Sequence, residues 1–226
     1  RREHMDILLE SLTGIRGIPE GTAEALYRIT GGNPLYLQEY LSYLAEKGIP
    51  LLGMAHVECG ERIPETILGL LSARMENLGK DRKRLLQEAS ILGMAFSHDL
   101  LQAVTSAGWE TGRFLNDLEE KGFLERTGDG RYHFRHALVR EAATATLLKR
   151  DRRQLHRKVG SHLERMSKSR AEHCGMIAYH LYHAGEYARA VPYFILAART
   201  CQAEGSWMEA AAQYRTQKKS QDHGVC

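Results

Sequence analysis

The segment that decides the fold of this chain reads Arg131-Tyr132-His133-Phe134-Arg135-His136-Ala137-Leu138-Val139-Arg140-Glu141. Its first four positions read as a strand, and the preceding stretch 122–126 supplies a second strand. The four residues 127–130 (Thr-Gly-Asp-Gly) lie between them, and an Asp-Gly pair flanked by apolar residues indicates a β-hairpin. Alanines and leucines then recur near helical spacing, so the hairpin passes directly into a helix. Arg135 and His136 lie at this junction, where unpaired backbone N–H groups and the helix dipole favour an anion.

The sequence around the hairpin divides into three modules and a tail. Residues 1–79 read as a helical bundle, punctuated by glycines that end helices and prolines that open them. Residues 80–148 give three helices followed by the hairpin, which is the order of a winged-helix domain. Residues 149–217 are helical throughout, and residues 218–226 abandon the apolar pattern and are expected to be disordered. The predicted fold class is therefore mainly α, with one β-hairpin.

A short pattern occurs twice in the third module. Residues 185–190 and 205–210 both read Gly-x-aromatic-x-charged-Ala. In each copy a glycine turn opens a helix, the aromatic residue packs on a neighbouring helix, and the alanine permits close approach. This logic is typical of the helical hairpins of tetratricopeptide-like (TPR-like) repeats.

Composition excludes several classes of protein. The 226 residues are 43% hydrophobic and 26% charged, as in an ordinary globular protein, and a net charge of +3 does not by itself indicate a nucleic-acid binder. No apolar run approaches the roughly 20 residues of a membrane span, and no signal peptide is visible, so no membrane partner is expected. The four cysteines lack CxxC spacing and suggest free thiols in a reducing, cytoplasmic compartment. The first residue is arginine, which favours a piece of a longer protein.

No set of residues carries catalytic or metal chemistry. The pairs His133/His136 and His180/His183 have HxxH spacing, but no nearby carboxylate completes a metal-site motif. No serine or cysteine lies in the sequence context of a Ser-His-Asp or Cys-His catalytic site. A phosphate loop of the form GxxxxGK[ST] is absent, since the Gly-Lys pair at 79–80 is followed by aspartate. We therefore predict no catalytic residue and no metal ligand, and do not expect this chain to hydrolyse nucleotide alone.

The third helix of the winged-helix module speaks against DNA binding. Residues 110–121 hold four acids and two bases, a net charge of −2 that repels phosphate. The basic clusters at 80–84 and 149–153 could touch nucleic acid, but the favoured interpretation of each is a solvated charge run at a helix end.

Three blocks of sequence resemble, in order and spacing, the C-terminal part of the STAND class of signalling ATPases. This class includes MalT-type transcriptional activators and ATPases fused to class III adenylate or guanylate cyclase domains. The resemblance spans residues 5–216. The block that resembles the lid consists of residues 31–37, 63–65 and 71–78. The block that resembles the winged helix consists of residues 85–93, Phe96 and residues 118–124. The third block consists of residues 134–141 with Arg153 and His156, and it leads into TPR-like repeats.

The resemblance implies half of a nucleotide site. In this class the Gly-x-Pro turn of the lid packs on adenine, a role that would fall to Gly32, Asn33 and Pro34. The winged-helix histidine of the class contacts the β-phosphate of ADP, which would be the role of His136, with Arg135 beside it. The cofactor implied is ATP or ADP, with Mg²⁺ in the parent protein. Because this chain lacks the phosphate-loop core of the class, no nucleotide is expected to bind tightly to it.

The expected function is that of a regulatory fragment of a nucleotide-switched signal-transduction ATPase. The lid and winged helix would sense ADP and ATP, and the helical repeats would sense a protein or small-molecule inducer. The parent is expected to be an ATPase, and its missing N-terminal nucleotide-binding core is the first expected partner. Two alternatives stay open, a winged-helix DNA-binding transcriptional regulator and a nucleotide-independent protein-interaction scaffold.

Overall fold

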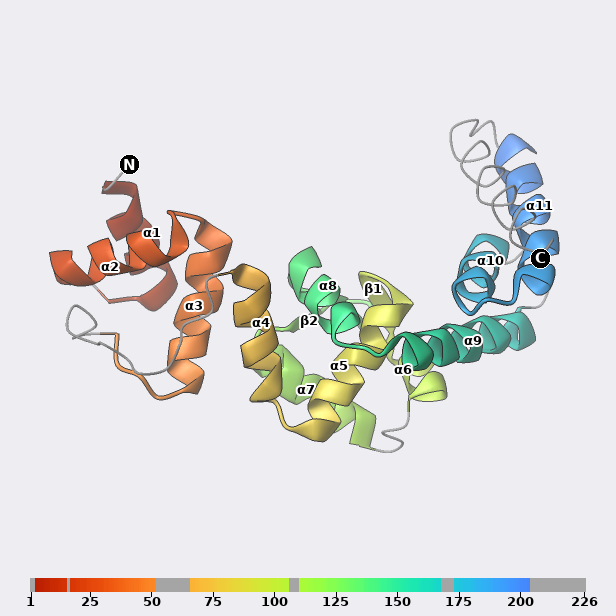
Figure 1. The fold of residues 1–226 in the computed structure, drawn as a ribbon, viewed down its shortest axis with the longest axis horizontal. Helices are drawn as coiled ribbons and strands as arrows, with labels where there is room; N and C mark the ends of the chain where they lie inside the picture. Colours follow the sequence, from red (N-terminus) through yellow and green to blue (C-terminus); the bar gives the residue numbers. More distant parts are fainter. Residues whose placement is uncertain (1–2, 16, 52–65, 106–109, 168–172, 204–226) are drawn as a thin grey trace. The chain divides into compact units, whose positions relative to one another are not determined.

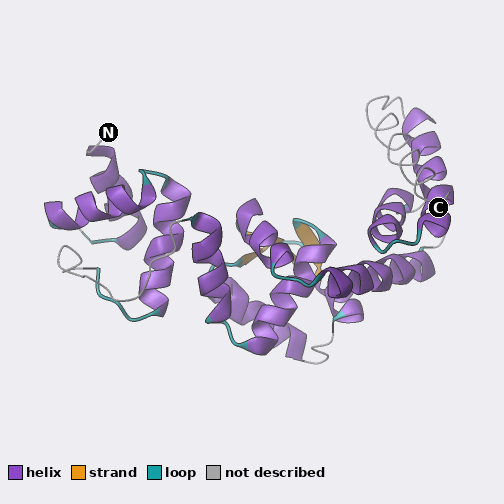
Figure 2. Cartoon of the chain, in the orientation of Figure 1, coloured by secondary structure: helices purple, strands orange, loops and turns teal. Residues whose placement is uncertain are grey.

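The computed structural model describes residues 3–15, 17–51, 66–105, 110–167 and 173–203. The described part of the chain is mainly helical, with eleven helices and three short strands (Figures 1 and 2). The predicted mainly α fold class is therefore confirmed. The chain forms two compact units, residues 1–83 and 84–226. No helix within the described ranges is both long and apolar enough to cross a membrane.

Four helices make up most of the first unit: α1 (Glu3–Thr13), α2 (Glu20–Thr30), α3 (Pro34–Glu46) and α4 (Ile67–Glu76). The chain turns sharply between α2 and α3. Gly31 ends α2 in the left-handed conformation with φ of 60°, which glycine adopts without a Cβ penalty. Asn33 then caps α3, and Pro34 fills its first position, where its missing N–H costs nothing. The glycine and the proline of this turn therefore end and begin helices, as predicted from the sequence.

The first unit buries an apolar core and one charged cluster. Leu26, Leu37 and Tyr40 are fully buried in this core. Arg74 of α4 is only 2% exposed and pairs with two glutamates of α3, Glu39 and Glu46. The Arg74 Nε and Nη2 atoms lie 3.0 and 2.6 Å from Glu46 Oε1. The cluster fastens α4 to α3, because a buried guanidinium is tolerated only when carboxylates surround it.

The second unit begins with the helix–strand–helix–helix–hairpin order of a winged helix. Its elements are α5 (Lys80–Leu92), β1 (Ala95–Ser97), α6 (His98–Val104), α7 (Thr111–Glu120), β2 (Leu124–Arg126), β3 (Arg131–Phe134) and α8 (Ala137–Ala145). The unit boundary falls within α5, after Lys83. The hairpin β2–β3 forms where the Asp-Gly turn predicted it. The short strand β1 was not predicted.

The three strands form one antiparallel sheet in the order β1-β3-β2. Glu125 of β2 and Ala95 of β1 both lie opposite His133 of the central strand. Phe96 stacks on Tyr132 with ring centroids 6.1 Å apart, and Phe134 lies 6.0 Å from Phe96. These aromatic rings bury one face of the sheet against the helices, which fixes the register and so the junction between β3 and α8.

Three further helices complete the described part of the second unit: α9 (Lys149–Met166), α10 (Cys174–His183) and α11 (Tyr187–Ala203). Helix α10 packs against both α9 and α11. The helices α9 and α10 approach closely at Gly160, where an added Cβ would lie 3.1 Å from Leu181 Cδ2. The second copy of the glycine–aromatic pattern, 205–210, and the tail 218–226 lie outside the described residues.

Candidate functional site

The predicted lid residues lie in the turn between α2 and α3 of the first unit. The Asn33 side chain accepts hydrogen bonds from the backbone N–H groups of Leu35 at 3.0 Å and Tyr36 at 3.3 Å. Gly32 has a φ of 75°, and a Cβ there would lie 2.8 Å from the Tyr27 ring. Asn33 and Pro34 are exposed. The Asn33 oxygen is therefore occupied by capping, and the groups that remain open to a ligand are the Pro34 ring and the outer side of the turn.

Arg135 lies at the end of the hairpin and is held by a neighbouring carboxylate. Its Nε donates to Glu125 Oε1 at 2.9 Å, while Glu125 Oε2 lies 2.9 Å from His133 Nε2. The guanidinium passes over Gly122, where a Cβ would lie 3.1 Å from Nη1. Arg135 is thus a partly exposed cation whose charge is already matched by Glu125, and the strand register that brings these residues together was not foreseen from the sequence.

His136 occupies the N-cap position of α8 with an extended backbone, φ −140° and ψ 146°. Its side chain makes no capping hydrogen bond, and its Nε2 is buried without a hydrogen-bond partner among the described residues. A buried polar atom of this kind costs free energy until a partner is supplied. His136 is therefore the predicted site residue whose polar side-chain atom the fold leaves unsatisfied.

Arg140 shares this property and was not singled out from the sequence. Its Nε is also buried without a partner in the described structure, although its Nη1 lies 3.4 Å from the Ser90 carbonyl oxygen. Arg140 lies in the first turn of α8, four residues after the N-cap His136. A basic residue so close to the helix start is the sequence signal that could have identified it. Each of the two residues leaves one buried side-chain nitrogen without a partner in the described structure, near a helix start that favours anions.

The five predicted residues belong to different units, with Gly32, Asn33 and Pro34 in the first and Arg135 and His136 in the second. The turn between α2 and α3 exposes the Pro34 ring, and the start of α8 holds the buried side-chain nitrogens of His136 and Arg140.

A second group of histidines lies between α9 and α10. The Nδ1 atoms of His156 and His180 are 3.0 Å apart, and the His183 ring stacks on His156 with centroids 5.1 Å apart. Burial, reinforced by the neighbouring imidazoles, lowers the pKa of His156 to about 3 and that of His180 to about 4. Burial and the nearby charge of Arg152 also lower the pKa of His183. All three rings are therefore neutral near pH 7 and pack as part of the helix interface.

Among the described residues, no group of three His, Cys, Asp or Glu side chains has the arrangement of a metal site. The histidines of the α9–α10 cluster face one another, and no described carboxylate joins them. Of the cysteines in the described ranges, Cys174 is buried and Cys201 partly buried, and neither forms a disulfide.

Comparison with known proteins does not identify a function for this chain. No family model matches the sequence. The chain is similar to an uncharacterized protein of Rhizobium meliloti (strain 1021), with 26% identity over 193 residues. The match covers 83% of this chain but 19% of the relative, so the chain spans about a fifth of the length of the protein that it matches.

Proposed function

We propose that this chain is the regulatory part of a STAND-class signal-transduction ATPase that is switched by nucleotide. In this proposal residues 1–83 contain the lid, the winged helix contacts ADP through His136, and α9–α11 begin a TPR-like array that senses an inducer. The Rhizobium relative is several times longer than this chain. A protein of that length has room for a nucleotide-binding core and an output domain, which is consistent with the proposal.

The observation that carries the proposal is the unsatisfied nitrogen of His136. Its Nε2 is buried at the start of α8, with the unpartnered Nε of Arg140 one turn further on. A phosphate oxygen that contacts His136 Nε2 would accept a hydrogen bond from it and would remove the cost of leaving it unpaired, and the Arg140 guanidinium adds positive charge to the start of α8. The sequence context of His136, between a hairpin and a helix, is also the context that the family resemblance requires.

Fewer lid residues would contact the nucleotide directly than the resemblance implied. Because the Asn33 oxygen caps α3, its role is to shape the turn. The exposed Pro34 ring would pack on the adenine, and Gly32 would keep the turn in its left-handed conformation under Tyr27. This division of roles makes Pro34 the lid residue whose loss should affect nucleotide binding most directly.

Switching requires that ADP and ATP bind two conformations with different affinities. ADP would hold the winged helix against the core through His136, and ATP together with an inducer would release it. Because this chain holds the lid and the winged helix without a phosphate loop, the isolated chain should bind nucleotide weakly and the core-containing protein tightly.

The test is ADP binding to a longer version of the protein that includes the predicted core. His136→Ala should weaken ADP binding by about tenfold or more, the effect of losing a charge-assisted hydrogen bond to phosphate. His162→Ala, which removes a half-buried histidine from α9, is the control and should leave ADP binding unchanged. Calorimetry and the ADP content of the purified protein are the two measurements.

Unchanged ADP content in the His136→Ala protein would overturn the assignment. An absence of ADP binding in both the short and the long protein would favour the scaffold alternative. Tight, salt-dependent DNA binding by this chain in a mobility-shift assay would instead support the DNA-binding regulator, against the expectation from the acidic residues Asp117, Glu119 and Glu120 of α7.

A further inference from the structure

A basic pocket lies beside the first half of α9, at the turn that joins α10 to α11. Its volume is about 880 Å³, and four cations line it: Lys149, Arg150, Arg153 and Arg157. The small residues of the turn, Ala184 and Gly185, and the ring of Tyr187 form its other side. Neither Arg135 nor His136 lines this pocket, so it is separate from the half-site proposed above.

The positive charge of this basic pocket is largely uncompensated. Lys149, Arg150 and Arg153 are exposed and make no ion pair within the part of the chain that the structure describes. Two acids adjoin pocket residues in the sequence. Asp151 lies 3.7 Å from Arg84 Nη1, and Glu186 pairs with Arg157, one of the four cations, and with Arg189. Among the described residues no acidic side chain lines the pocket, so Lys149, Arg150 and Arg153 carry its unpaired charge.

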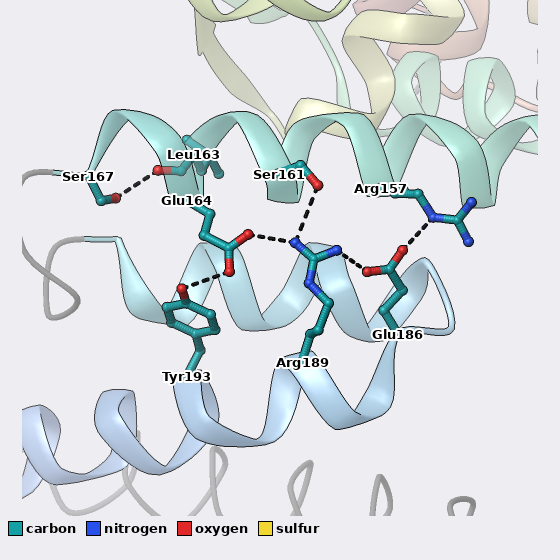
Figure 3. A network of polar contacts seen from close by, with 8 residues as sticks. All are labelled: Arg157, Ser161, Leu163, Glu164, Ser167, Glu186, Arg189 and Tyr193. Atoms are coloured by element: carbon teal, nitrogen blue, oxygen red, sulfur yellow. Dashed lines mark hydrogen bonds and ion pairs between the residues drawn. The ribbon is translucent and has the colours of Figure 1, made fainter.

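A polar network holds one wall of the basic pocket in place (Figure 3). Glu186 accepts a hydrogen bond from Arg157 of α9 and another from Arg189 of α11. Arg189 also pairs with Glu164, whose other oxygen accepts a hydrogen bond of 2.8 Å from the Tyr193 hydroxyl. Arg157 is therefore oriented before any ligand arrives, which lowers the entropic cost of binding.

The turn beneath the pocket is also fixed. Gly185 has a φ of 82°, and its N–H donates to the Tyr182 carbonyl oxygen at 2.9 Å. The Tyr187 ring packs edge-on against Tyr182, with centroids 5.4 Å apart. Because Gly185 has no side chain, the space above the turn stays open. The ring of Tyr187 borders this space beside the cations.

We propose that this basic pocket binds the phosphate groups of a small phosphorylated molecule. Its volume lies in the range of about 300–1,000 Å³ that is usual for small-molecule sites. Guanidinium groups match phosphate oxygens in a bidentate geometry, and the two unpaired arginines, Arg150 and Arg153, with Lys149 suit more than one phosphate. Tyr187 supplies a face for an apolar or aromatic part of the ligand. The cations of α9 share one pocket with the α10–α11 turn, which favours a compact anion over the long backbone of a nucleic acid.

The test uses the intact 226-residue chain and inorganic tripolyphosphate as the probe, with binding measured by calorimetry at low and moderate salt. We expect one saturable site. Arg153→Ala should weaken binding by about tenfold, as expected for the loss of one charge-assisted contact to phosphate. Lys158→Ala is the matched control, because it removes one positive charge from an exposed position of α9 that does not line the pocket, and it should change binding by less than about twofold. Far-UV circular dichroism checks that both variants remain folded.

Four results would overturn the proposal. Absence of tripolyphosphate binding is the first, and equal weakening by Arg153→Ala and Lys158→Ala, which would indicate a diffuse field, is the second. The third is tighter binding of an oligonucleotide or an acidic peptide with the same dependence on Arg153, which would assign the pocket to a macromolecule. If His136→Ala abolished tripolyphosphate binding while Arg153→Ala retained it, the anion would belong to the start of α8, and this pocket would have no ligand role.

Discussion

At the scale of single residues, the charged cluster around Arg74 is a buried feature that the sequence did not predict. The guanidinium is buried between Glu39 and Glu46, which are 35 and 28 residues away in sequence. No periodic pattern predicts such a pair, because its members are far apart along the chain. Asn33 is the opposite case. Its capping role was predictable, since it depends only on the residues that follow it.

Replacing Arg74 should therefore be costly. Arg74→Ala leaves Glu39 buried without its partner, and we expect the free energy of unfolding of the first unit to fall by about 3–5 kcal/mol. Urea denaturation followed by far-UV circular dichroism measures this loss. The control is Lys83→Ala, which breaks the exposed ion pair with Glu76 and should cost less than about 1 kcal/mol. If the two variants lost the same stability, the Arg74 cluster would have no special energetic role.

At the scale of secondary-structure elements, the sequence predicted most helices and the hairpin, because these depend on local spacing and turn chemistry. Strand β1 was missed, since three residues are too few to show a period. Leu148 and Met166 continue the helical spacing of apolar residues, yet they are 71% and 67% exposed. Each lies at a helix end, where the pattern continues but the packing stops. The pairing of Arg135 with Glu125 depends on strand register, so it appears only in the structure.

The histidines between α9 and α10 make the stability of this interface depend on pH. The pKa values of His156 and His180 are lowered to about 3 and about 4, whereas the unfolded chain has the ordinary value near 6.5. The unfolded state therefore binds more protons below pH 6.5. Stability should be full above about pH 6.5 and fall toward pH 4, by up to about 1.4 kcal/mol per pH unit for each histidine.

Thermal unfolding between pH 4 and 8 measures this dependence. In the His180→Gln variant one titrating group is removed, so the decline of the melting temperature with falling pH should be shallower. A matched change outside the cluster, His162→Gln, should retain the original slope. An identical pH dependence in all three proteins would exclude the buried histidines as its source.

At the scale of the whole molecule, the chain forms two units with separate buried clusters, one around Tyr40 and the other including Phe96 and Phe134. Units that each bury their own core can unfold separately. Whether either unit acts as a lid or as a sensor depends on partners outside this chain. The residues of the chain do not identify these partners, so the function was predicted from the family resemblance.

We therefore expect two unfolding transitions, resolved by hydrogen exchange and mass spectrometry at increasing urea concentrations. Arg74→Ala should lower the transition reported by peptides from residues 1–83 and leave that of residues 84–203 in place. Loss of protection in both units at the same urea concentration, in both proteins, would show that they unfold as one cooperative body.

The close approach at Gly160 also bears on how this chain can change over generations. A methyl group added there would lie 3.1 Å from Leu181 Cδ2, so the Leu181 side chain or the helix must shift to make room. We therefore expect fewer residue types to be tolerated at position 160 than at Gly128 in the hairpin turn, where an added Cβ would meet no described atom within 4 Å. The two glycines look alike in the sequence, yet only Gly160 has a packing reason to remain glycine.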